Sequence, residues 1–347
     1  MDTMHGPLTK FLPRYVLVVL IGCLALACRF SGLDEKSRVE NRKSVPEFSI
    51  PERVPGRNYV YFIAIGDQGM GDNNQKHVAR LMNEKARNDS LHFVLTLGDN
   101  FYSKGVTSVN DMQWQFKFEK IYDLAHLRAP FYASLGNHDH SNGNARHQVE
   151  YAKKNPKWKM PHYYYTFSKA IDAHSSIQFF VLDTYVIVQS GEYAIEQIDW
   201  LERELQASTA TWKIVYGHHP VFSYGKHGNE VRMIDLVRPL LEKYAVDAYL
   251  CGHDHDRQLL EPVGGVYYIV SGTGAKSRDT RYGETTIFAE TNLGFTWFRV
   301  SAGEFHVQFI NVYGDVEYAH TWTKGAVPKR PYEAFSEVGR FVTNEDD

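Results

Sequence analysis

Residues 92–102 read HFVLTLGDNFY, and this stretch decides the fold. Its apolar first half is typical of a buried β-strand, which ends abruptly at Gly98, directly before Asp99. Glycine lets the chain turn sharply off a strand and lets the backbone approach a bound ion closely. Four other apolar runs end in the same way. The five endings read GDQG at 66–69, GDN at 98–100, GNHDH at 136–140, GHHP at 217–220 and GHDHD at 252–256.

Apolar runs rich in β-branched and aromatic residues alternate with amphipathic stretches from Tyr59 onward. This alternation predicts an α/β protein, or α+β in some classification schemes, with largely buried sheets. We expect strands at 59–65, 92–97, 131–135, 177–183, 212–217, 247–252 and 266–272. Apolar residues at three- and four-residue spacing predict helices at 73–87, 111–122, 195–205 and 231–244.

The five strand endings are expected to converge, because ligands of open α/β sheets bind outside the carboxyl ends of the strands. Two metal ions about 3.5–4 Å apart need one small anionic ligand that bridges them, with further O and N donors on either side. The endings supply carboxylate, amide and imidazole groups of this kind. The candidate ligands are Asp67, Asp99, Asn137, His218, His253 and His255.

The order of these motifs resembles the signature of the calcineurin-like metallophosphoesterases: an Asp motif, GDN, GNHD or GNHE, a later GH and a final GHxH. Within that superfamily, Tyr102 follows Asp99 by three residues, the GDxxY spacing that distinguishes purple acid phosphatases. The segments VYGHHPVFSYGKHG at 215–228 and YLCGHDHDRQ at 249–258, with VSGTG after them, are similar to the single-domain, mammalian-type tartrate-resistant acid phosphatases. The resemblance runs from about Tyr61 to beyond Gly274.

The resemblance implies two packed mixed β-sheets flanked by helices, the metallo-dependent phosphatase sandwich. It also implies an acid phosphatase that hydrolyses phosphate monoesters with a metal-bound hydroxide as nucleophile. The cofactors would be Fe(III) together with Fe(II), Zn(II) or Mn(II). In the family pattern, Asp67, Tyr102 and His255 hold the ferric ion, Asn137, His218 and His253 hold the divalent ion, and Asp99 bridges the two.

Two histidines lie where this family places groups that contact phosphate or protonate the leaving group. They are His138, next to Asn137, and His227, nine residues after His218. An imidazole titrates in the range that such proton transfer needs. The resemblance therefore implies catalytic roles for both, whereas a structural role is the alternative for each.

The sequence departs from the animal enzymes in a few places. Gln68 stands where those enzymes often have an aromatic residue, and a disulfide within the domain is excluded because Cys251 is its only cysteine. The loop 141–148 reads SNGNARHQ and is rich in turn formers. We expect substrate choice to depend on loops at 103–110, 142–147 and 185–193, and the natural substrate is not written in any motif.

The N-terminus predicts export. Lys10 and Arg14 precede an apolar run at 15–28 that suits a signal peptide better than a membrane span. Its end, Ala25-Leu26-Ala27-Cys28, is similar to the lipidation box of bacterial lipoproteins, so we expect a periplasmic, cell-surface or secreted protein, with Cys28 as a candidate lipid anchor to the membrane. The predicted division is a signal peptide at 1–28, a linker at 29–57, the phosphoesterase domain at 58–325 and a tail at 326–347.

The formal net charge of −3 provides no basic field for nucleic acid. We expect a monomer that acts on small phosphate monoesters or phosphoproteins. Two alternatives stay open: a phosphodiesterase or nucleotide pyrophosphatase of the same superfamily, and a non-catalytic exported lipoprotein that binds metal.

Overall fold

The computed structural model describes residues 47–334, which lie within one unit of the chain. The predicted signal peptide, Cys28, most of the predicted linker and residues 335–347 of the predicted tail lie outside the described residues. Residues 47–57 carry no helix or strand, although the Arg53 guanidinium lies 2.9 Å from the Asp89 carboxylate. Within 47–334, no helix has the length and apolar character needed to cross a membrane.

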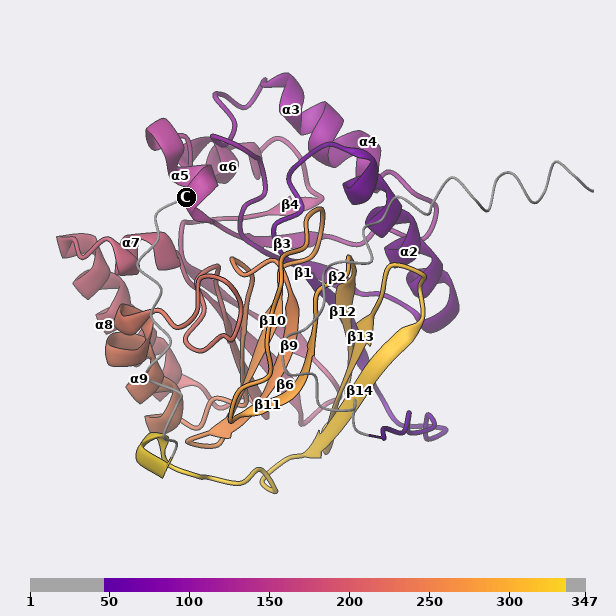
Figure 1. The fold of residues 1–347 in the computed structure, drawn as a ribbon, viewed down its shortest axis with the longest axis vertical. Coiled ribbons are helices and arrows are strands. Elements are labelled where there is room, and N and C mark those ends of the chain that lie inside the picture. Colours follow the sequence, from indigo (N-terminus) through magenta and orange to yellow (C-terminus); the bar gives the residue numbers. More distant parts are fainter. Residues whose placement is uncertain (1–46, 335–347) are drawn as a thin grey trace, which may run out of the picture. The chain divides into compact units, whose positions relative to one another are not determined.

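Two mixed sheets of seven strands each form the centre of this unit (Figure 1). In the first sheet the order is β14-β13-β12-β1-β2-β3-β4, and β1 to β4 run parallel. Its strands are β1 (Val60–Ile65), β2 (Phe93–Leu97), β3 (Phe131–Ser134), β4 (Trp158–Lys159), β12 (Phe295–Val300), β13 (Glu304–Ile310) and β14 (Val316–Thr323).

The second sheet has the order β11-β9-β10-β8-β7-β6-β5, and its parallel part is β6, β7, β8 and β10. Its strands are β5 (Tyr165–Ala170), β6 (Ser176–Val181), β7 (Trp212–Tyr216), β8 (Ala248–Cys251), β9 (Arg257–Val263), β10 (Val266–Ser271) and β11 (Thr286–Glu290). All seven predicted strands are present, and the expected pair of mixed sheets flanked by helices is confirmed.

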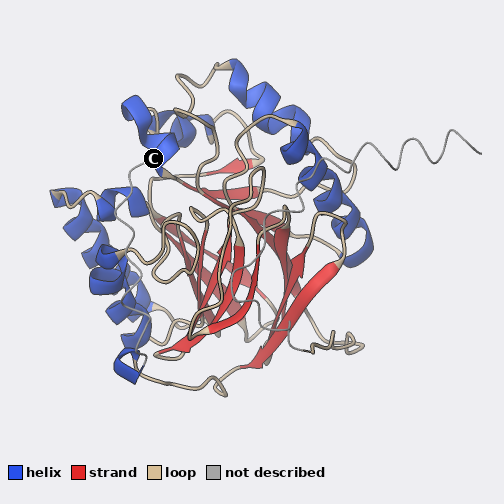
Figure 2. Ribbon diagram, viewed as in Figure 1, coloured by secondary structure: helices blue, strands red, loops and turns tan. Residues whose placement is uncertain are grey.

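Helices surround the two sheets, as Figure 2 shows. The largest are α2 (Asn73–Asp89), which begins where the Asp72 carboxylate accepts a hydrogen bond from Gln75 N, and α8 (Glu192–Ala207). The helices predicted at 111–122 and 231–244 each contain a π-helical turn. They comprise α3 (Met112–Trp114), η1 (Gln115–Glu119) and α4 (Lys120–Tyr122), and η3 (Met233–Val237) and α9 (Arg238–Lys243). Shorter helices are α5 (Asn137–His140), η2 (Ser141–Gly143), α6 (Arg146–Tyr151), α7 (Thr184–Val188) and η4 (Tyr332–Ala334).

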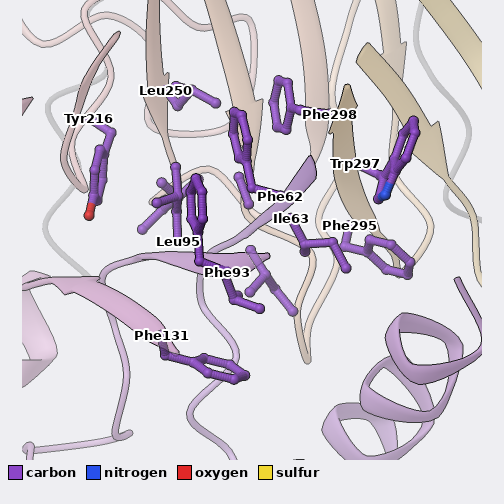
Figure 3. Close-up of a cluster of buried hydrophobic side chains, with 14 of the residues drawn as sticks. Phe62, Ile63, Phe93, Leu95, Phe131, Tyr216, Leu250, Phe295, Trp297 and Phe298 are labelled. Atoms are coloured by element: carbon purple, nitrogen blue, oxygen red, sulfur yellow. The ribbon is translucent and has the colours of Figure 1, made fainter. Parts of the chain in front are cut away.

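Stacked aromatic rings hold the sheets together (Figure 3). The Phe62 ring on β1 stacks on Phe93 of β2 and on Phe298 of β12, with centroids 5.2 and 4.5 Å apart. It also meets Phe179 of β6, in the second sheet, edge to face at 5.4 Å. All four rings are fully buried. Phe62 therefore joins three strands of one sheet to the other sheet.

We predict that Phe62→Ala lowers the free energy of unfolding by about 3–5 kcal/mol, because it removes a fully buried ring and leaves a cavity. Urea unfolding followed by circular dichroism measures the loss. The matched control is Phe116→Ala, whose ring is half exposed and should change stability by less than about 1 kcal/mol. Equal effects of the two substitutions would contradict the central role of Phe62.

A pH-dependent term in stability is predicted from His306 on β13, which is 1% exposed. Its Nε2 accepts a hydrogen bond from Gln308 Nε2 and its Nδ1 lies 2.7 Å from Thr321 Oγ1, so the surroundings fit the neutral ring. Burial lowers the pKa of His306 to about 3. The unfolded chain therefore binds more protons between pH 6.5 and 3, and this term of stability is lost as the pH falls through that window.

The test compares wild type with His306→Gln by urea unfolding at pH 7 and pH 4.5. The variant should lose less stability on acidification than wild type does, with a difference of at most about 3 kcal/mol. Identical losses in both proteins would show that His306 does not contribute.

Candidate metal centre

The seven predicted ligands come together at the carboxyl ends of parallel strands from both sheets. Asp67 follows β1, Asp99 and Tyr102 follow β2, and Asn137 follows β3 in the first sheet. From the second sheet, His218 follows β7, and both His253 and His255 follow β8. One ligand atom from each of Asp67, Asp99 and His218 lies within 4.8 Å of the other two.

The first group of ligand atoms consists of Asp67, Tyr102 and His255. The Tyr102 hydroxyl lies 2.9 Å from Asp67 Oδ1 and 3.2 Å from His255 Nε2. His255 Nε2 is 3.4 Å from the same Asp67 oxygen. Three different strand ends therefore bring a carboxylate, a phenol and an imidazole to one point.

The second group consists of Asp99, Asn137, His218 and His253. His218 Nε2 lies 3.1 Å from Asn137 Oδ1, 3.2 Å from His253 Nδ1 and 3.6 Å from Asp99 Oδ2. Three chain segments that are far apart in the sequence thus place O and N donors around the Nε2 atom of His218.

These separations suit metal coordination. Ligands bonded to one ion at about 2.0–2.2 Å lie roughly 3 Å from each other, which is the spacing in both groups. Carboxylate, phenol, amide and imidazole form an O and N donor set for iron, zinc or manganese. The residues present therefore fit two neighbouring ions, with Asp67, Tyr102 and His255 for one and Asn137, His218 and His253 for the other. Asp99 has a carboxylate oxygen within 4.8 Å of a ligand atom in each set, one of Asp67 and one of His218.

Electrostatics agrees with this fit. Burial, followed by the neighbouring Asp67 and Asp99 carboxylates, raises the pKa of Tyr102 well above its ordinary value. Burial is also the main cause that raises the pKa of Asp67 to about 8, and Asp99 adds to it. Acidic groups concentrated in a buried place favour their neutral forms unless a cation compensates them. A multivalent ion supplies that compensation.

The backbone at the centre is held in unusual conformations. Asp67, Asp99 and His253 have φ values of 58°, 53° and 68°, in the left-handed region that L-residues rarely adopt. Such conformations persist only where the surrounding structure enforces them, and they cluster at functional sites. At Gly136 a Cβ atom would lie 2.1 Å from Asp99 Oδ1, so only glycine permits this approach.

Asp139 connects the loops that carry the ligands. It is fully buried and accepts hydrogen bonds from the backbone N–H groups of Gly136, Asn100 and Phe101 at 2.9 to 3.1 Å, and from Gln148 Nε2 at 2.7 Å. The endings of β2 and β3 are thereby tied to each other through one carboxylate.

Hydrogen bonds also fix His218. Its Nδ1 lies 2.8 Å from the Leu97 carbonyl, which can only accept, so Nδ1 carries the proton and Nε2 is left with a lone pair facing the other ligands. Thr184 Oγ1 accepts a hydrogen bond from His218 N and lies 2.8 Å from Nδ1 of the neighbouring His219. Thr184 lies outside every quoted motif, and His219, although it is part of GHHP, was not among the candidate ligands.

His138 and His227 occupy the rim of the centre. His138 Nδ1 lies 2.7 Å from the Ser103 carbonyl and therefore donates, while Nε2 is 3.9 Å from Asp99 Oδ2. The His227 ring lies 4.2 Å from the His253 ring. Arg278 cannot accept a hydrogen bond, so at 2.8 Å its Nη1 donates to His227 Nε2. Burial lowers the pKa of His227, and its neutral ring carries its proton on Nδ1.

Comparisons with known proteins agree with this geometry. Residues 60–257 match the calcineurin-like phosphoesterase family. Tartrate-resistant acid phosphatase type 5 from Homo sapiens is 37% identical over 61% of this chain and 72% of its own length. Purple acid phosphatase 3 from Arabidopsis thaliana is 33% identical over 79% of each chain.

A solved structure supports the fold alone. It is described as "GAP50 the anchor in the inner membrane complex of Plasmodium", and it matches with a TM-score of 0.72 and 24% identity over 79% of this chain and 90% of that one. The family match, the two curated relatives and the ligand geometry lead to one conclusion: this chain belongs to the calcineurin-like phosphoesterases, in the group of the tartrate-resistant and purple acid phosphatases.

Proposed function

We propose that this chain is an acid phosphatase that hydrolyses phosphate monoesters at a binuclear centre of Fe(III) and a divalent ion, Fe(II), Zn(II) or Mn(II). The observation that carries the proposal is the buried Tyr102 hydroxyl, 2.9 Å from Asp67 Oδ1 and 3.2 Å from His255 Nε2. A phenol is a poor ligand at its ordinary pKa of about 10, and a raised pKa makes it poorer. A trivalent ion is a strong enough Lewis acid to deprotonate it.

When bound, two such ions polarise phosphoryl oxygens and lower the pKa of bound water. In our proposal Asp67, Tyr102 and His255 would hold the trivalent ion, whereas Asn137, His218 and His253 would hold the divalent one. With the carboxylates of Asp67 and Asp99 and the Tyr102 phenolate, the ligands carry fewer negative charges than the ions carry positive ones, so the centre attracts a phosphate dianion.

His138 is the group that we assign to substrate. Its Nδ1–H donates to the Ser103 carbonyl, its side chain is about one-third exposed, and its Nε2 lies 3.9 Å from Asp99 Oδ2. As an imidazolium, with both nitrogens protonated, His138 can donate Nε2–H to a phosphoryl oxygen or give that proton to the leaving alkoxide. His227 cannot donate from Nε2, because that nitrogen accepts the hydrogen bond from Arg278 Nη1. Any proton transfer from neutral His227 has to start at Nδ1.

Substrates of this site are small phosphate monoesters or phosphoproteins in our proposal. A diester has one negative charge fewer to neutralise at the centre, and the phenolate position favours the purple acid phosphatase chemistry over a diesterase. Export, with or without a lipid on Cys28, and a monomeric state remain predictions.

Tyr102→Phe should abolish the visible colour of the iron-loaded protein, because the colour of a ferric-tyrosinate needs the phenolate oxygen. The measurement is the visible absorption spectrum of protein produced from Arg29 onward, together with its iron content. Tyr313→Phe, which alters a tyrosine that is 78% exposed, is the control and should keep the band. A colourless wild-type protein with full iron occupancy would refute the tyrosinate.

His218→Ala should lower kcat/KM for p-nitrophenyl phosphate by at least about a hundredfold, since it removes the nitrogen around which the second ligand group is built. His126→Ala, an exposed histidine before β3, is the control and should retain activity. Bis(p-nitrophenyl) phosphate is assayed beside the monoester. Faster turnover of the diester would make the chain a phosphodiesterase, and unchanged turnover in His218→Ala would place the activity outside this centre.

A further inference from the structure

A cationic pocket includes in its lining Arg278, which contacts residues of the metal centre. It has a volume of about 550 Å³ and is lined by two segments, Tyr224, Gly225 and Lys226 after β7, and residues 278–281 before β11. Three of its side chains are positive, namely Lys226, Arg278 and Arg281, against one acidic side chain, Asp279. The chain as a whole carries a formal charge of −3, so this positive lining is local.

One residue of the pocket lining, Arg278, contacts two histidines of the centre directly. Arg278 donates its backbone N–H to the carbonyl of His255 at 2.8 Å and its Nη1–H to His227 Nε2. The ammonium group of Lys276, from the same segment, lies 5.0 Å from the centre of the Tyr102 ring. The segment 276–281, which supplies Arg278 and Arg281, therefore contacts residues that we assign to the metal ions and to the leaving group.

We propose that this cationic pocket binds a second phosphoryl group of the substrate, so that the enzyme prefers small phosphate monoesters whose leaving group carries another phosphate. The inference rests on the proposed phosphatase function. One phosphoryl group is cleaved at the centre, while the other is held by Lys226, Arg278 and Arg281.

The chemistry of the lining favours phosphate. Arginine presents N–H groups in a planar fork that matches a phosphate or carboxylate, and its charge persists at every pH relevant to an acid phosphatase. Cations lining a concave surface also concentrate anions near it.

The shape of the lining favours a small molecule. The volume lies within the usual range for small-molecule sites, about 300–1,000 Å³. A phosphoprotein segment would instead need an extended groove or an exposed sheet edge to bind along its length. The described lining consists of two short segments, 224–226 and 278–281, and neither belongs to a strand. They also differ from the loops at 103–110, 142–147 and 185–193 that the sequence indicated for substrate choice.

The test is a pair of matched substrates, propyl phosphate and propane-1,3-diol bisphosphate, with hexane-1,6-diol bisphosphate added to vary the span. Phosphate release gives kcat and KM for each. Wild type should prefer a bisphosphate, and Arg281→Gln should reduce that preference by about tenfold, mainly through KM, because a charge-assisted hydrogen bond is lost. Arg281 is chosen because it lines the pocket without belonging to the proposed ligand set. High salt should also weaken the preference.

Arg128→Gln is the control, since it removes the same charge from the loop before β3, at the opposite end of that strand from Asn137. It should leave the ratio of the two kcat/KM values unchanged. A ratio unaltered by Arg281→Gln for both bisphosphates would overturn the inference while leaving the phosphatase intact. An acidic phosphopeptide is assayed beside them. If Arg281→Gln lowers kcat/KM for the phosphopeptide and leaves the bisphosphates unchanged, the substrate is a protein and the inference is overturned. Release of phosphate from none of these compounds would instead refute the proposed function.

Discussion

Two buried carboxylates brought close together are the constraint on which this structure depends. Asp67 and Asp99 end adjacent parallel strands, both are almost completely buried, and both have a left-handed backbone. Like charges in such a place are unfavourable unless cations lie between or beside them. The other candidate ligands add little negative charge. The imidazoles and the Asn137 amide are neutral donors. Tyr102 is the third acidic ligand beside Asp67 and Asp99, and its ordinary pKa is the highest of the three.

The two sheets share the task of building this arrangement. Oxygen ligands come chiefly from the first sheet and nitrogen ligands from the second, so the centre exists only where the sheets pack against each other. The core supports the same packing, because Phe62 of the first sheet touches Phe179 of the second. At the ligand end, Asp67 Oδ2 accepts a hydrogen bond from His253 N across the two sheets. The hydrophobic core and the metal centre thus both require the same relative position of the two sheets.

Five of the seven strands predicted from the sequence share one property: a continuous apolar run that ends in Gly and a ligand-type residue. They are β1, β2, β3, β7 and β8, and their ends carry the whole candidate site. Strands such as β9 and β13 were not predicted, since the polar residues Arg257, Gln258 and His306 interrupt their apolar pattern although they are buried. The role of Asp139 was equally hidden. Its five hydrogen-bond contacts involve segments up to 39 residues away, and no local pattern records such a contact.

The hydrogen bonds to Asp139 have a consequence for how the centre accommodates metal ions. Gly136, Asn100, Phe101 and Gln148 donate hydrogen bonds to Asp139, and Gly136 approaches Asp99 closely. These hydrogen bonds fix the loops that present Asp99 and Asn137 through groups that are not themselves candidate ligands. Exchanging one bound ion for another would therefore leave these contacts in place.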